Sequence, residues 1–126
     1  MSDPIQELPG LTVTIDQVLH QPDAQTPPDR RHCFAYFISI HNHSDATVTI
    51  KGRKWVVRDD DGNTIALEGD GVVGQFPKLH PGEKFSYNSY HVFNTDSAVA
   101  EGSYLGITDD GRRVFTRIPR FEMHVP

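Results

Sequence analysis

The feature that most constrains this chain is an alternation of apolar and polar residues with a period of two. Leu11, Val13 and Ile15 alternate with polar neighbours, which is typical of a strand with one buried and one exposed face. The run His32–Ile40 is too apolar for simple alternation and fits a central strand buried on much of both faces. A helical period of 3.6 is almost absent, and only Ser97–Glu101 would tolerate a short helix.

Two similar segments predict β-hairpins. In Trp55–Gly69 and Tyr104–Pro119, a turn with aspartates and a glycine separates two alternating runs. We count about seven to eight strands, which favours an all-β, immunoglobulin-like antiparallel β-sandwich over a barrel or an α/β sheet. Trp55 is expected in its core, and Pro119 at an edge or a bend. Tyr104 fits either a tyrosine corner or a half-buried strand position.

Length and charge narrow the class of protein. The 126 residues predict a single domain over 1–126, in which we expect 1–9 to be a disordered N-terminal tail. The net charge of −5 has the wrong sign for a protein that binds duplex nucleic acid through phosphates. The single Cys33, the lack of a leader pattern and the lack of a long apolar run predict a cytoplasmic protein with no membrane span.

A glycine-rich string is the most conspicuous motif. Gly69–Gly74 has the form G-x-G-x-x-G, but Pro77 and Pro81 forbid the helix that a dinucleotide-binding fold needs after it. Two interpretations remain: an anion-binding nest of backbone amides, or glycines that only permit close backbone approach. Arg53, in a basic run, would be the phosphate clamp of such a nest; the alternative is a cation on the outer face. The candidate ligand-binding residues are Gly69, Asp70, Gly71, Gly74 and Arg53.

Metal and catalytic sites have less support in the sequence. His41 and His43 would lie on one face of a strand, a spacing that a metal uses, but two ligands make a poor site. The string Asp59–Gly62 fails the calcium-loop pattern and fits a hairpin tip. Cys33 lies in an apolar run where its thiol would be inert. The sequence therefore predicts no enzyme, no metal beyond the candidates His41 and His43, and no cofactor.

Several short strings in a fixed order carry a family resemblance. They are Phe34–Tyr36, Ile40–Asn42, Gly52–Trp55, Glu68–Gly74, Leu79–Glu83, Phe85–Tyr87 and Ile118–Phe121. In this order and spacing, over about Gly10–Pro126, the chain resembles the ApaG family. It departs from the family pattern at Thr95–Glu101, where a Thr-Pro-x-Gly string is common.

The resemblance implies a fibronectin type III-like sandwich and a bacterial cytoplasmic protein linked by name to cobalt and magnesium resistance. Since a small acidic domain without a membrane span does not itself move ions across a bilayer, that link is expected to be indirect. Related domains in F-box proteins and in a polymerase-associated mitochondrial protein suggest protein binding. The family's glycine motif, offered as a nucleotide or pyrophosphate site, corresponds here to Gly69, Gly71 and Gly74.

We therefore expect a non-enzymatic binding module that presents loops or a sheet edge to a protein partner. The alternative is a small-anion binder that holds a nucleotide or pyrophosphate on Gly69–Gly74. Pairing of a sheet edge with a second copy of the chain, which gives a homodimer, is a further expectation.

Overall fold

The structure is a computed structural model that describes residues 4–126. Within these residues all regular structure is β, and it comprises nine strands. They are β1 (Gln6–Glu7), β2 (Leu11–His20), β3 (His32–Asn42), β4 (Val48–Asp59), β5 (Thr64–Asp70), β6 (Lys78–Leu79), β7 (Lys84–Phe93), β8 (Ser97–Thr108) and β9 (Arg113–His124). The described residues offer no helix that is long and apolar enough to cross a bilayer.

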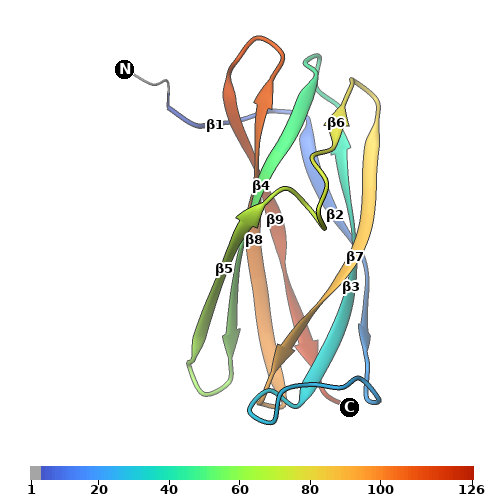
Figure 1. The fold of residues 1–126 in the computed structure, drawn as a ribbon, viewed down its shortest axis with the longest axis vertical. Helices are drawn as coiled ribbons and strands as arrows, with labels where there is room; N and C mark the ends of the chain where they lie inside the picture. Colours follow the sequence, from blue (N-terminus) through green and yellow to red (C-terminus); the bar gives the residue numbers. More distant parts are fainter. Residues whose placement is uncertain (1–3) are drawn as a thin grey trace.

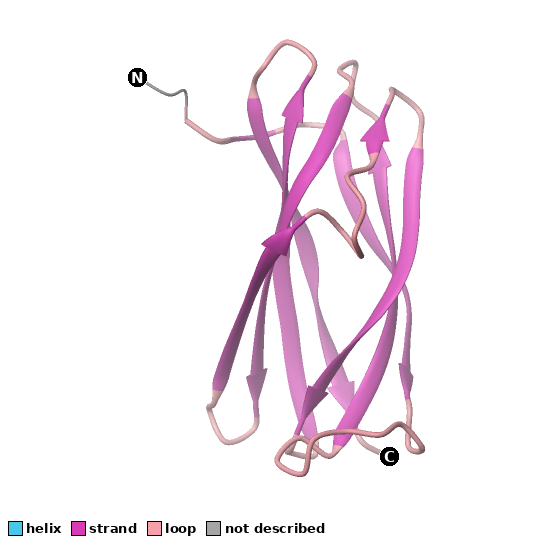
Figure 2. Ribbon diagram, in the orientation of Figure 1, coloured by secondary structure: helices cyan, strands magenta, loops and turns pink. Residues whose placement is uncertain are grey.

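The strands form two sheets that pack face to face (Figures 1 and 2). The large sheet has the order β1-β9-β8-β4-β5, with β6 beside β4, and the small sheet has the order β2-β3-β7. Neighbouring strands are antiparallel except β1 and β9. The all-β sandwich predicted from the alternation is thus confirmed.

The core lies between the two sheets, and β2, β3, β4, β8 and β9 all contribute buried apolar side chains to it. On β3, Ile38 and Ile40 are fully buried and no residue of the strand is fully exposed, as the sequence predicted. On β4, Ile50 and Trp55 are buried against them. Burial of each large apolar side chain contributes about 1.5–3 kcal/mol, so the packing of these side chains between the sheets stabilises the sandwich.

Both predicted hairpins are confirmed, and their turns are held by side chains. Oδ1 of Asp59 accepts hydrogen bonds from the backbone N–H groups of Asp61 at 3.0 Å and Asn63 at 2.9 Å. Gly62 in this turn and Gly111 in the β8–β9 turn have φ of +84° and +86°, which only glycine adopts without cost. Asp59 and its neighbours therefore form a hairpin tip, as expected.

The two long sides of the sandwich differ. On one side β2 packs against β9, and Oγ1 of Thr116 donates to the carbonyl of Leu11 at 2.7 Å. On the other side β5 and β7 are the edge strands of their sheets, and the segment 71–77 runs between them (Figure 1). The small sheet ends at β7, so it has no further strand that would cover the inner face of β5.

Two local expectations concern Ser97–Glu101 and residues 1–9. Ser97–Glu101, the stretch that would tolerate a short helix, is the start of β8, because β4 and β9 pair with it on both sides. The expectation of a disordered tail over residues 1–9 fails for Gln6–Glu7, which pair with Val114–Phe115, and for Leu8, which is buried. Residues 1–3 of that segment lie outside the described residues.

Tyr104 and Pro119 mark two irregular places on the large sheet. Tyr104 is fully buried, and its hydroxyl bonds to the hydroxyl of Tyr87 across the sandwich; it is neither a tyrosine corner nor half-buried. Pro119 lies where the β8–β9 register shifts, so the bend predicted from proline is confirmed. The missing N–H of Pro119 falls where the ladder is already interrupted.

Candidate functional site

A cleft of about 750 Å³ opens between the unpaired edges of β5 and β7. One wall comes from β4 and β5 of the large sheet, and the other from β3 and β7 of the small sheet. The loop 21–31, at one end of the molecule in Figure 1, adds Ala24, Pro27 and Arg30. The cleft thus lies on the side of the sandwich where the edge strands β5 and β7 are not packed against each other.

Most of the wall on the large sheet is apolar, and its outer part is exposed to solvent. In the β4–β5 register Trp55 pairs with Leu67, and Val57 pairs with Ile65. Since register partners lie on the same face of a sheet, all four side chains point to the inner side. Trp55 is 2% exposed, whereas Leu67 is 46% exposed. The inner face at β5 is therefore left uncovered.

The floor of the cleft is a buried aromatic cluster of Tyr36, Trp55 and His91. The ring centroids of Tyr36 and His91 are 4.8 Å apart, and those of Trp55 and His91 are 4.7 Å apart. Nε1 of Trp55 and Nε2 of His91 are buried and have no hydrogen-bond partner in the described chain. A buried polar group without a partner costs about 1–3 kcal/mol, so the floor contains polar atoms whose hydrogen-bonding capacity is unused.

Burial controls the titration of the groups around the floor. It lowers the pKa of His91 to about 4, which keeps the imidazole neutral at pH 7. It raises the pKa of the Cys33 thiol, which favours the protonated thiol at pH 7. It also raises the pKa of Tyr36, against smaller effects of the Ser89 and Tyr87 hydroxyls and of Arg53. The floor is thus uncharged at neutral pH.

Arg53 provides a fixed positive charge on the large-sheet wall of the cleft. Its side chain is half-buried, and its Nη1 donates to the carbonyl oxygens of Asp70 at 2.9 Å and Gly71 at 3.2 Å. A Cβ at Gly69 would lie 2.8 Å from both Nη1 and Nη2. The guanidinium therefore lies across the backbone of Gly69, and the first glycine of the motif makes room for it.

The remaining part of the glycine string is a tight hairpin. Val72 and Gln75 exchange two backbone hydrogen bonds, of 2.8 and 2.9 Å. Between them Val73 has φ of +43° and Gly74 has φ of +78°, the signature of a type I′ turn. A positive φ is strained for a β-branched residue such as Val73.

The structure places Arg53 beside the predicted anion-site residues Gly69, Asp70 and Gly71, but two backbone N–H groups of this segment already donate to protein carbonyls. The N–H of Gly71 donates to the carbonyl of Lys51 at 2.8 Å, and that of Val72 is held by Gln75. A Cβ at Gly71 would lie 2.3 Å from the carbonyl oxygen of Gln75. Two of the three motif glycines, Gly69 and Gly71, therefore permit close approach, and Gly74 permits the turn.

The histidine pair predicted as a candidate metal site lies on the small sheet, at β3 and just after it. The rings of His41 and His43 stack with centroids 5.6 Å apart, and Nε2 of His41 is 2.9 Å from Oγ1 of Thr14. Among residues 4–126 no three His, Cys, Asp or Glu side chains gather in a metal-binding arrangement. The pair therefore stands without a third ligand in the part of the chain that is described.

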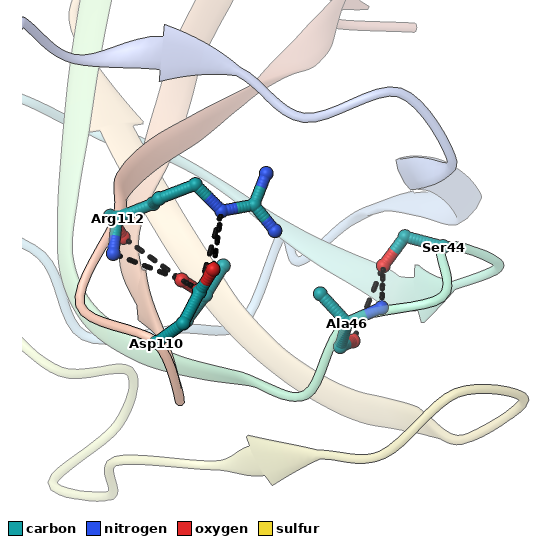
Figure 3. A network of polar contacts seen from close by, with 5 residues as sticks. Ser44, Ala46, Asp110 and Arg112 are labelled. Carbon is teal, nitrogen blue, oxygen red and sulfur yellow. Dashed lines mark hydrogen bonds and ion pairs between the residues drawn. The ribbon is translucent and has the colours of Figure 1, made fainter.

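The turns drawn in Figure 3 are held by hydrogen bonds within each turn. Nε of Arg112 donates to both carboxylate oxygens of Asp110 at 3.2 and 3.1 Å. Oγ of Ser44 donates to the carbonyl of Ala46 and accepts from its N–H, both at 3.2 Å. These bonds stabilise the two turns.

Sequence reasoning placed Trp55 in the core and Arg53 near the glycine string, but did not single out Tyr36, His91 or Leu67. Tyr36 lies in the apolar run His32–Ile40 and His91 in the extended run after Phe85, and neither stands out by residue type. Their grouping depends on how the two sheets overlap, and no local pattern encodes that overlap.

The fold and the cleft together define a small β-sandwich domain with a cleft at one open side. A family model described as the ApaG domain matches residues 22–107. The chain belongs to the ApaG domain family.

Sequences and a solved structure of related proteins match this chain over most of its length. A Protein ApaG from Xanthobacter autotrophicus is 39% identical over 100 residues, covering 79% of this chain and 77% of the relative. A Protein ApaG from Vibrio cholerae is 34% identical over 119 residues, covering 94% of each chain. The crystal structure of an ApaA protein from Bordetella pertussis superimposes with a TM-score of 0.84 at 28% identity, covering 98% of each chain.

Proposed function

We propose that this chain is a non-enzymatic binding module that takes an extended segment of another cytoplasmic protein in the cleft between β5 and β7. One observation carries the proposal: two sheet edges that no described strand pairs with flank an apolar wall, which is half-buried at Ile65 and 46% exposed at Leu67. An unpaired edge offers backbone N–H and C=O groups to an added strand, and the wall offers apolar contact to its side chains. The link to cobalt and magnesium resistance is then indirect, through the partner.

The exposure of apolar side chains at both edges supports this role. Leu67 on β5 is 46% exposed and Tyr90 on β7 is 64% exposed, and both line the cleft. Exposed apolar groups along an unpaired edge are an aggregation hazard unless the edge serves a partner. An aromatic ring at the rim is also the kind of residue that dominates binding energy at interfaces.

The titratable groups of the cleft support binding without catalysis. Burial raises the pKa of Cys33, so the unreactive thiol form dominates at pH 7. Burial lowers the pKa of His91 to about 4, well below the range that suits a general base at neutral pH. Nε2 of His91 also has no hydroxyl or thiol partner among the described residues to activate.

Selection of peptides tests the proposal. A random nonapeptide library displayed on phage is selected against the full chain, and the peptides obtained are titrated into labelled protein. We expect shifts at the amides of β5 or β7 and at the indole N–H of Trp55. Leu67→Lys should weaken binding by about tenfold or more, which corresponds to 1.4 kcal/mol.

A matched control comes from the outer face of the large sheet. Ile107 on β8 is 40% exposed, a fraction similar to the 46% of Leu67, but its side chain lies on the opposite face of the sheet. Ile107→Lys should leave peptide binding unchanged. Peptides that bind the Leu67 and Ile107 variants equally, or a selection that yields no binder at the cleft, would contradict the proposal.

The nucleotide or pyrophosphate hypothesis ranks second. In its favour, Arg53 lies beside the glycine string and only its Nη1 donates to the string. Against it, the N–H groups of Gly71 and Val72 already donate to protein carbonyls. An anion nest needs these groups free and convergent, so we favour the cleft.

A further inference from the structure

We propose that Arg53 selects an acidic side chain on the bound segment, and that this acid stands in a fixed spacing from two apolar residues. The inference rests on the peptide-binding role proposed above and specifies the chemistry of the partner. The occupant is a strand that pairs antiparallel with β5 and carries the pattern acid-x-apolar-x-apolar.

The charge of Arg53 is uncompensated in the free protein. Among residues 4–126 no carboxylate lies within 4.0 Å of its guanidinium nitrogens. Of the two carboxylates on the neighbouring strand β5, Glu68, which also lines the cleft, is bound to Lys54 at 3.3 Å. The other, Asp70, forms no ion pair within 4.0 Å among the described residues. A half-buried cation of this kind favours an incoming anion, because burial from water strengthens their attraction.

The guanidinium is also held in place before any partner arrives. It carries five N–H donors, and the bonds to Asp70 and Gly71 use Nη1 alone. Arg53 pairs in register with Gly69, and its guanidinium lies across that residue toward the carbonyls at the end of β5. The cation therefore extends from β4 over the edge strand, where an added strand would meet it.

The β5 register places the other contacts. Ile65, Leu67 and Gly69 alternate on the inner face of β5, so neighbouring positions on that face are about 7 Å apart. A strand added to this edge sets its own inner-face side chains beside them at the same interval. Apolar side chains then lie beside Ile65 and Leu67, and the third, beside Gly69, meets the guanidinium of Arg53.

A carboxylate fits the site better than a phosphate. The other cation that lines the cleft, Arg30, lies 4.0 Å from the carboxylate of Asp29, which leaves Arg53 to balance the ligand. One guanidinium matches the single charge of Asp or Glu in bidentate geometry. We assign the antiparallel orientation because antiparallel ladders are slightly more stable per residue.

The experiment repeats the peptide selection on the full chain and on Arg53→Gln. We expect sequences selected on the unmodified chain to be enriched in Asp or Glu two and four positions before apolar residues, and this enrichment to disappear on Arg53→Gln. A selected peptide should bind the unmodified chain about tenfold more tightly than its copy with the acid changed to Gln or Asn. The two copies should bind Arg53→Gln equally.

Controls separate failure of this inference from failure of the proposed function. Lys54→Gln, which removes the adjacent cation on the outer face, should keep the preference for the acid. If cleft-binding peptides show no acidic preference on the unmodified chain, the role of Arg53 is refuted while the peptide-binding role stands. If no peptide binds at the cleft, the proposed function fails. Competition by inorganic pyrophosphate below millimolar concentration would instead identify a small-anion site, and would overturn the inference.

Discussion

The guanidinium of Arg53 occupies the space that any side chain at position 69 would need. A Cβ on Gly69 would lie 2.8 Å from both terminal nitrogens of Arg53, closer than such atoms approach without displacement. The first glycine of the G-x-G-x-x-G string therefore has a steric role that depends on an arginine of the neighbouring strand, and the string need not bind a phosphate to require glycine there.

Gly69→Ala should displace the guanidinium of Arg53 while leaving its charge in the protein, and so tests whether the position of that guanidinium matters. Because the clash involves the end of a flexible side chain, the arginine should move aside, and the free energy of unfolding should fall by about 1 kcal/mol, the low end of overpacking costs. The preference for acidic peptides should be lost even though the charge remains. Urea denaturation measures the first effect, and titration with the acidic and amide peptides measures the second.

Gly52→Ala is the matched control for this variant. A Cβ at Gly52 would meet its nearest neighbour, the carbonyl oxygen of Gly69, at 3.4 Å, which is an ordinary contact. This variant should keep both the stability and the acidic preference. An unchanged preference for the acid in Gly69→Ala would contradict the view that Gly69 positions the guanidinium.

Val73→Asn should stabilise the protein by about 1 kcal/mol, since it relieves strain at a positive φ and creates the Asn-Gly pair favoured in type I′ turns. Val73 is 47% exposed and has φ of +43°, so little apolar contact is lost. Urea denaturation gives the free energy of unfolding. Val73→Ile keeps the branched side chain and should bring no gain; equal stability of the Asn and Ile variants would show that the strain is not relieved.

The hairpins, the central strand and the absence of a helix after Gly74 could be predicted, because each follows from a local pattern. The aspartates and glycine of Asp59–Gly62 predict a turn on their own, and the apolar run His32–Ile40 predicts a strand buried on much of both faces. The cleft follows from a non-local property: β5 extends beyond the cover of a three-stranded sheet. The alternation that makes Leu67 an inner-face residue does not say whether anything covers it.

The glycine string illustrates the same division between local and non-local information. The prolines Pro77 and Pro81 correctly exclude a dinucleotide-binding helix. That Gly69 makes room for Arg53, and that Gly71 approaches the carbonyl of Gln75, depends on strand register and on a turn closed by Val72. The glycines were recognisable from the sequence, but the groups that crowd them were not.

Stability should fall as the pH drops below 6.5, because of His91. Burial lowers its pKa from 6.5 to about 4, so between these values the unfolded chain binds a proton that the folded chain refuses. The contribution of neutral His91 to the free energy of unfolding is therefore fully present above pH 6.5 and is lost as the pH falls toward 4. Between pH 7.5 and pH 5 the loss from this group is about 2 kcal/mol. Urea denaturation at the two pH values measures it.

His91→Phe should abolish this part of the pH dependence, whereas the exposed His124→Gln should retain it. The carboxyl groups of Asp16, Glu83 and Asp110 have lowered pKa values, below their ordinary 3.8 or 4.5, and so act below this window. If the chain with His91→Phe loses as much stability as the unmodified chain between pH 7.5 and pH 5, the assignment to His91 is wrong.

Inorganic pyrophosphate should leave the amide resonances of Gly71 and Val72 unshifted up to millimolar concentration. Their N–H groups donate at 2.8 Å to the carbonyls of Lys51 and Gln75, and an anion would have to break bonds that hold the turn together. Each buried hydrogen bond contributes about 0.5–1.5 kcal/mol, and one guanidinium offers little to offset two of them. Arg53→Ala provides the comparison. Saturable shifts across residues 69–74 at sub-millimolar pyrophosphate, lost in Arg53→Ala, would restore the small-anion site and reverse the ranking of the two functions.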